Sequence, residues 1–358
     1  MGRPSPLVLE RSTRHGLPGR HCDSVVGAAR LTVAIQAQDA PASRLGIRAR
    51  LPGVTEADVI AAVEDVRSVA RTWLMRGTIH LVDAADLRWL VRLTGPVTRR
   101  RMRLRWSQMG LTDDVLDRCL TLLDDVLADG PRTRAEVRAA FESDGVARAF
   151  TEDQATTHVL LHASTVGAVC RATDRGRDAT FARLADWLPD APEGPSGDEA
   201  SAELARRYFA AFAPATSADF GAWSGLPHGR AVGLIRDELT PVDVDGRPGF
   251  RLGEVEPERG VRLLPAFDNY LIGYADRAAI VPGAARPMVY QGGMIRPTVV
   301  ADGAVVGSWS LPRSSGRLSV TPFGSSWPKR VLAEVEREAA DVARFIGADV
   351  ALTVLAPV

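Results

Sequence analysis

Two short sequences in this chain, Thr55-Glu-Ala-Asp58 and Thr133-Arg-Ala-Glu136, place an acidic residue three positions after a threonine. This spacing is typical of a capping box, in which the two side chains satisfy backbone N–H groups at the start of a helix. Each sequence lies in a stretch where helix-like runs are followed by two short strand-like runs. Two helices and then a small hairpin are the order of a winged helix.

The repeated pattern predicts an α+β fold with three tandem winged helix-turn-helix modules, followed by a small C-terminal β-barrel. The expected modules cover residues 1–110, 111–190 and 198–253, and the barrel with its closing helix covers residues 254–358. In the first two modules, helices are expected over 24–35, 55–66, 83–93, 112–127, 133–142 and 151–162, with hairpins at 71–82 and 166–183. The modules share no obvious sequence repeat, so this prediction rests on the pattern alone.

Two Asp-Gly pairs predict tight turns in the second half of the chain. Asp245-Gly246 and Asp302-Gly303 are each flanked by strand-like residues, and Asp-Gly is a preferred pair for two-residue hairpin loops. A closing helix is expected over 328–346 and a last strand over 350–355.

Charge is unevenly distributed along the 358 residues. The net charge is zero, but residues 1–110 contain 18 Arg against 9 Asp or Glu. A basic part beside an acidic remainder suggests one face for a polyanion. The three cysteines are far apart, which argues against a disulfide framework and a cysteine-based zinc site. With no apolar run long enough to cross a bilayer and no secretory segment, the protein is expected in the cytoplasm.

The densest basic run is Arg99, Arg100, Arg101, Arg103 and Arg105. On a helix these arginines would recur about one turn apart and could follow a phosphate backbone. The alternative, equally open from the sequence, is a solvated helix face.

Gln36-Ala37-Gln38 is the most unusual polar segment, because it ends an apolar stretch that is expected to be helical. Residues two apart share a side only on extended backbone, so both amides can serve one site only where the helix unwinds before Pro41. Composition alone favours a simpler role at a helix end. His158 and His162 have the spacing of paired metal ligands, but they lack a third ligand pattern, and neither metal nor cofactor is expected.

Several segments together resemble one family, the winged-helix proteins that include the AlkZ and YcaQ DNA glycosylases. Their shared order covers nearly the whole chain. The segments are Leu31-Thr-Val-Ala-Ile-Gln36-Ala-Gln38, Arg71-Thr-Trp-Leu-Met-Arg-Gly-Thr-Ile-His80, Pro214-Ala-Thr-Ser-Ala-Asp-Phe220 with Trp223, Arg262-Leu-Leu-Pro-Ala-Phe-Asp268-Asn-Tyr270, and Asp302-Gly-Ala-Val-Val-Gly307-Ser-Trp309.

The resemblance implies hydrolysis of the N-glycosidic bond of N7-alkylated purines in double-stranded DNA. It also implies that Gln36 and Gln38 are the catalytic residues, because the family motif is Gln, an apolar residue, then Gln or Asp. The all-glutamine form is typical of the AlkZ-type members that unhook interstrand crosslinks, so self-resistance to a DNA-alkylating natural product is an expected role. The absence of a dimerisation heptad favours a monomer.

Other residues in these segments, or near them, are candidates for DNA contact. Arg76 and His80 are expected to bind DNA, and Asp268 is expected to border the cleft, although structural hydrogen bonds would explain His80 and Asp268 equally well.

A further candidate is the segment Tyr290-Gln-Gly-Gly-Met294-Ile-Arg296. A turn at Gly292-Gly293 would expose Met294 and Ile295 beside Arg296 as an apolar wedge for the minor groove. The alternative is that the two apolar residues face the barrel core.

Two other functions fit a winged-helix chain. It could be a transcription regulator without chemistry, in which the glutamines only contact the DNA backbone, or a structural binder of damaged DNA.

Overall fold

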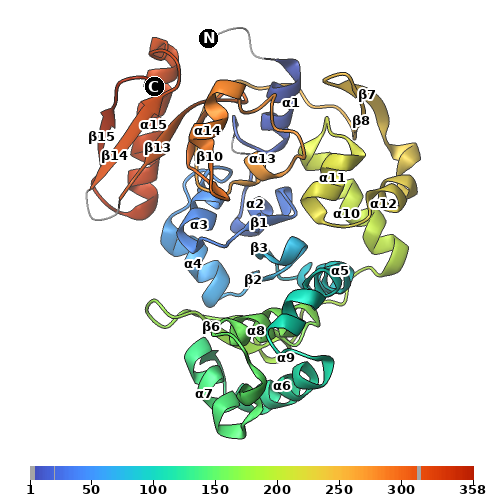
Figure 1. The fold of residues 1–358 in the computed structure, drawn as a ribbon. Coiled ribbons are helices and arrows are strands. Elements are labelled where there is room, and N and C mark those ends of the chain that lie inside the picture. The colour runs from blue at the N-terminus through green and yellow to red at the C-terminus, as the bar shows by residue number, and fades with distance from the viewer. Residues whose placement is uncertain (1–4, 20, 313–315) are drawn as a thin grey trace. The chain divides into compact units, whose positions relative to one another are not determined.

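The computed structural model describes residues 5–19, 21–312 and 316–358, coloured along the chain in Figure 1. Unit 1 comprises the described residues up to Ile60, Ala202–Trp223 and Pro227–Val358, and unit 2 comprises Ala61–Ser201 with Ser224–Leu226. The fold is mixed α+β, as predicted. Within the described ranges, no helix has the length and apolar character needed to span a membrane.

Unit 2 consists of helices and short strands in the order β3–β2–β5–β6–β4. Strand β2 pairs antiparallel with β3, and β5 pairs antiparallel with β6, which confirms both predicted hairpins. The elements are β2 (Val69–Trp73), η1 (Met75–Gly77), β3 (Ile79–Asp83), α5 (Leu87–Gln108), α6 (Asp113–Val126), β4 (Arg132–Thr133), α7 (Arg134–Asp144), η2 (Val146–Ala149), α8 (Ala155–Thr165), β5 (Val169–Arg171), β6 (Thr180–Arg183) and α9 (Leu184–Trp187).

Helix α5 is longer than predicted. It continues past the expected end at residue 93 and contains Pro96. Proline removes one backbone donor from a helix, but the Thr94 and Thr98 hydroxyls bond back to Leu90 O and Thr94 O in the same stretch. The whole arginine run therefore lies on one helix.

Both predicted capping boxes form. Thr133 Oγ1 accepts from Glu136 N at 3.2 Å while the Glu136 carboxylate accepts from Thr133 N. At the start of α4 (Glu56–Glu64), Asp58 Oδ2 accepts from Thr55 N at 2.8 Å and Thr55 Oγ1 accepts from Asp58 N at 3.2 Å. These local bonds explain why the sequence located the two helix starts.

Unit 1 is built from three segments of the chain, and α4, α10 and α11 contain borders between the units. Its elements are α1 (Pro6–Arg14), α2 (Val25–Leu31), β1 (Ala34–Gln36), α3 (Ala40–Arg48), α10 (Gly197–Phe212), α11 (Ser217–Ser224), α12 (His228–Leu234), η3 (Arg236–Glu238), β7 (Thr240–Val244), β8 (Arg247–Arg251), β9 (Val261–Leu264), α13 (Asn269–Ile272), η4 (Gly283–Ala285), α14 (Arg286–Val289), β10 (Tyr290–Gln291), β11 (Met294–Ile295), β12 (Thr298–Ala301), β13 (Ala304–Ser310), β14 (Arg317–Pro322), α15 (Lys329–Ile346) and β15 (Ala351–Val354).

Both Asp-Gly pairs form hairpin turns in unit 1. Asp245 and Gly246 join β7 to β8 with φ of 50° and 76°, and Asp302 and Gly303 join β12 to β13 with φ of 50° and 83°. Positive φ at both central residues matches the right-handed twist of the paired strands.

The C-terminal sheet has the order β15–β14–β13–β12–β9 and is open, because its described edge strands β15 and β9 do not pair with each other. The predicted closed barrel is therefore corrected to a half-barrel. Helix α15 lies along this sheet (Figure 1), and its apolar side, including Val331, Val335 and Val342, packs against Leu263, Val299 and other sheet residues. Since the helix buries the apolar face of the sheet, closure is not needed to form a core.

The division into four modules remains a prediction. The three winged helices are pattern-based expectations, whereas the two units group residues by their spatial contacts.

Candidate functional site

The backbone that leads into Gln36 is extended, so the expected helix over residues 24–35 is wrong in its last four residues. Helix α2 ends at Leu31, Val33 has a φ of 67°, and β1 begins one residue later. Left-handed backbone is rare for a β-branched residue, and it turns the chain out of the helix. Gln36 is 9 % exposed at the end of β1, whereas Gln38 is exposed in the bend that follows.

Helix α3 begins directly after the glutamines and was missed in the sequence. Asp39 is its N-cap, with Oδ1 accepting from Ala42 N at 2.9 Å, and Pro41 lies in the first turn. An Asp cap followed by proline is a helix-start signal. Pro41 therefore marks the start of α3, and Gln38 lies on the short connection between a strand and a helix.

Asn269 contacts the backbone of the glutamine segment from the opposite end of the sequence. Its Oδ1 accepts a hydrogen bond from Gln36 N at 3.2 Å, and its Nδ2 donates to Ala34 O. The side-chain amide of Gln36 itself forms no hydrogen bond within the part of the chain that the structure describes. The backbone of Gln36 is thus fixed while its amide stays available for a ligand.

Asp268 forms a buried ion pair with Arg50. Two hydrogen bonds of 2.9 Å join Arg50 to the two carboxylate oxygens, and both side chains are buried. Burial alone would lower the pKa of Arg50, but the charge and hydrogen bonds of Asp268 raise it above the ordinary value. Asp268 faces Arg50 rather than solvent, so it makes the structural hydrogen bonds that were the alternative to a place beside the cleft. Its place beside a cleft stays a prediction.

In unit 2, Arg76 and His80 lie in the β2–β3 hairpin. Arg76 has a φ of 60° in the turn, and His80 is buried on β3. The Nδ1 of His80 lies 2.9 Å from Thr78 O. Because a carbonyl only accepts, Nδ1 carries the proton. Burial above all, and then the charge of Arg76, lower the pKa of His80 to about 3, so the ring is neutral.

The five arginines between residues 99 and 105 of α5 divide into two groups. Arg99 donates to Thr165 O, Arg101 donates to Gly225 O at 2.9 Å, and Arg105 forms two hydrogen bonds with the carboxylate of Glu152. These three hold protein groups together.

The other two, Arg100 and Arg103, are exposed, as is Arg101. Arg103 forms an ion pair of 3.6 Å with Asp113. Neither Arg100 nor Arg103 forms a hydrogen bond within the described residues, and a contact of either with phosphates stays a prediction.

The β10–β11 hairpin turns at Gly292 and Gly293, whose φ values are 55° and 83°. Met294 is 54 % exposed and Arg296 is exposed, but Ile295 is only 7 % exposed. The expectation that both apolar residues are exposed is therefore wrong for Ile295, because side chains alternate along a strand and only one can face solvent.

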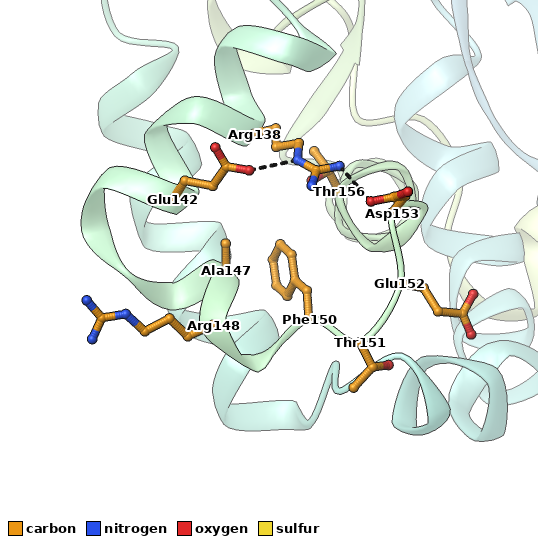
Figure 2. Close-up of a pocket in the computed structure, with 9 residues that line it drawn as sticks. All are labelled: Arg138, Glu142, Ala147, Arg148, Phe150, Thr151, Glu152, Asp153 and Thr156. Atoms are coloured by element: carbon orange, nitrogen blue, oxygen red, sulfur yellow. Dashed lines mark hydrogen bonds and ion pairs between the residues drawn. The ribbon is translucent and has the colours of Figure 1, made fainter.

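Unit 2 has a surface pocket of about 590 Å³ whose lining includes none of the predicted residues, although Glu152 in that lining pairs with Arg105. Its lining is Arg138, Glu142, Ala147, Arg148, Phe150, Thr151, Glu152, Asp153 and Thr156. Figure 2 shows Arg138 bonded to Glu142 and Asp153 above the Phe150 ring. These internal pairs neutralise much of the charge that would attract a ligand.

His158 and His162 have protein partners rather than a shared open site. His158 Nδ1 accepts from Trp106 Nε1 at 3.2 Å, and the ring of His162 packs edge-on against the same indole at 5.1 Å.

Comparison with known proteins agrees with this arrangement. The family model "DNA glycosylase AlkZ-like" matches residues 29–345. A protein named "Interstrand DNA cross-link repair glycosylase" from Streptomyces sahachiroi is 32 % identical over 336 residues, which are 87 % of this chain and 88 % of the relative. The solved structure of Streptomyces sahachiroi DNA glycosylase AlkZ has a TM-score of 0.85 at 27 % identity and covers 99 % of this chain and 100 % of its own.

The family match and the likeness in structure define an enzyme that acts on DNA. The chain belongs to the AlkZ-like DNA glycosylase family.

The sequence did not reveal Asn269 or Arg50. Each is an ordinary polar residue locally, and its partner lies more than 200 positions away. The only local signal was Asp268 before a short helix, since aspartate is a common N-cap.

The buried His80 makes stability depend on pH. The unfolded chain binds a proton at this histidine below about pH 6.5, while the folded protein does so only near pH 3. Stability therefore falls on acidification between these values, by about 1.4 kcal/mol per pH unit from this residue. Urea unfolding of wild type and His80→Gln between pH 7 and 5 should show a shallower pH dependence in the variant; parallel curves would contradict a neutral buried ring.

Proposed function

We propose that this glycosylase hydrolyses the N-glycosidic bond of N7-alkylated purines in double-stranded DNA, interstrand crosslinks and bulky natural-product adducts included. The observation that carries the proposal is the path of Gln36-Ala37-Gln38, which leaves β1 at Gln36 and bends before α3, with the Gln36 amide unpartnered by the described residues. The printed name of the relative, an interstrand crosslink repair glycosylase, supports the lesion class.

Glutamine suits this leaving group. An N7-alkylated purine is already cationic, so the electron pair of the C1′–N9 bond neutralises it on departure and no general acid is required. The sugar then develops oxocarbenium character and is captured by water, which loses its proton to solvent. An amide carbonyl can accept from that water while its NH₂ donates to the sugar-phosphate. A neutral amide therefore acts by placing the water rather than by removing its proton.

The strand and bend, in place of the expected helix, allow a joint role for the two glutamines. On a helix, residues two apart diverge, whereas on extended backbone they share a side. Strand β1 ends at Gln36, and Gln38 follows in the bend before α3. The nearly buried Gln36 and the exposed Gln38 would meet the sugar at different depths.

The remaining parts of the proposal concern architecture and setting. The order α6, β4, α7, α8, β5, β6 in unit 2 supports a winged helix, because a hairpin follows three helices. We extend this to three tandem winged-helix modules that act as a monomer in the cytoplasm, where the protein would serve DNA repair or self-resistance to an alkylating antibiotic.

Substitution of the glutamines tests the chemistry. Gln36→Ala and Gln38→Ala should each lower single-turnover base excision from an N7-methylguanine duplex by roughly 10–10³-fold, as expected when a water-positioning group is lost. DNA affinity should change little. Abasic sites are quantified by alkaline cleavage, and wild-type rates in the double variant would rule out Gln36 and Gln38 as catalytic residues.

The exposed arginines test the electrostatic contact. Arg100→Ala with Arg103→Ala should reduce the slope of log Kd against log salt by about 1.8, since each lost phosphate contact contributes about 0.9. Arg118→Ala is the control, because Arg118 is paired with Asp144 on another helix of unit 2. Equal slopes for all three proteins would leave α5 as a solvated face.

The β10–β11 hairpin tests the wedge. Met294→Ala should slow excision of a bulky adduct with an unchanged melting temperature, since the side chain is exposed and would act by unstacking a base step. Ile295→Ala should instead cost about 2–5 kcal/mol of stability, because it empties a buried position. Thermal melting and excision assays separate the role of Met294 as a wedge from that of Ile295 in packing. Full activity in Met294→Ala would contradict the wedge.

A further inference from the structure

The amide of Asn269 bonds to the backbone on both sides of a strained residue. Nδ2 donates to Ala34 O and lies 3.5 Å from Thr32 O, and Oδ1 accepts from Gln36 N. The carbonyls of Thr32 and Ala34 flank Val33, the residue with a φ of 67°. The Asn269 side chain thus bonds to the residue before Val33, to the residue directly after it, and to Gln36 three positions further along the chain.

The strain at Val33 makes these bonds matter. A β-branched residue in the left-handed region is unfavourable and persists only where surrounding structure holds it. Val33 and Ala34 are fully buried, so the turn is packed as well as bonded. If the amide were removed, the backbone that leads to Gln36 would lose the hydrogen bonds at Gln36 N and Ala34 O and could move toward an unstrained conformation.

Asn269 is itself firmly placed. It follows Asp268, whose Oδ1 accepts from Tyr270 N at 2.9 Å and whose carboxylate binds Arg50. Arg50 also donates to Gly46 O, at 2.9 Å, on the helix that follows the glutamines. At Gly46, an added Cβ would come within 3.3 Å of Ile35 Cγ2, so the missing side chain lets α3 lie close to β1.

The bonds of Asn269 reach only main-chain atoms of the glutamine segment. They set where the Cα of Gln36 lies and leave the side-chain amide available. This is the arrangement expected of a residue that aims another group rather than reacting itself, since a small misplacement of a reactive group slows catalysis strongly.

We propose that Asn269 is a positioning residue for base excision, which acts by fixing the backbone that carries Gln36. This inference rests on the proposed catalytic role of Gln36. The Asp268–Arg50 pair holds the residue directly before Asn269. The ion pair therefore acts on the reaction through Asn269 and Gln36.

A double-mutant cycle tests the proposal on the full-length protein with an N7-methylguanine duplex. Asn269→Ala should lower the single-turnover excision rate at saturating enzyme by about 10–100-fold, while the Kd for DNA stays within about twofold. Asn269→Ala with Gln36→Ala should be no slower than Gln36→Ala alone, because Asn269 acts through Gln36.

Two more variants separate positioning from stability. Tyr270 lies next to Asn269 in α13, and its hydroxyl donates to Gly303 O at 2.6 Å rather than to β1. Tyr270→Phe removes this hydroxyl, and the variant should excise at the wild-type rate below its melting temperature. If Asn269→Ala fails to fold, Asn269→Ser retains a neutral polar group that is too short to span Gln36 N and Ala34 O, and it should be slow but folded.

Three results would overturn the inference. The first is a wild-type excision rate in Asn269→Ser, and the second is a loss of rate in Tyr270→Phe equal to that in Asn269→Ala. The third is a loss in the Gln36 and Asn269 double variant that equals the product of the two single losses. In each case a slow Gln36→Ala protein would leave the proposed function standing. A wild-type protein that releases no base would overturn the proposed function, and the inference with it.

Discussion

The ion pair between Arg50 and Asp268 is the interaction on which the glutamine segment depends. It joins the end of α3 to the start of α13 with two 2.9 Å hydrogen bonds out of contact with water. Two buried charges are stable only when each is well paired, and loss of one partner leaves the other uncompensated. The pair therefore places two elements from distant parts of the chain beside the strand that ends at Gln36.

His15 gives this region a further constraint. It is fully buried in contact with the rings of Phe212 and Tyr270, with its Nδ1 3.5 Å from Arg50. Burial, and then the charges of Arg50 and Arg11, hold the pKa of His15 well below its usual range. A neutral ring avoids placing a second positive charge beside Arg50, so the ion pair remains balanced.

Signals confined to a few residues predicted much of the fold. The two capping boxes and the Asp-Gly turns were located correctly, because the bonds or backbone angles that form them lie within four residues. The path around Gln36 was predicted wrongly, because the strain at Val33 is held by Asn269, 233 positions from Gln36. The arginine run illustrates the same limit for function: the sequence shows five arginines, but contacts such as Arg105 with Glu152 decide which are engaged by protein groups.

The contacts of Asn269 have a consequence for how such enzymes diversify. The Asn269 amide bonds to main-chain atoms only, so its hydrogen bonds to β1 do not depend on which side chain occupies position 36 or 38. Replacement of the side chain at either position therefore leaves these backbone bonds in place. On the catalytic role proposed for Gln36 and Gln38, the chemistry of the site can change by single replacements while the support of β1 is kept.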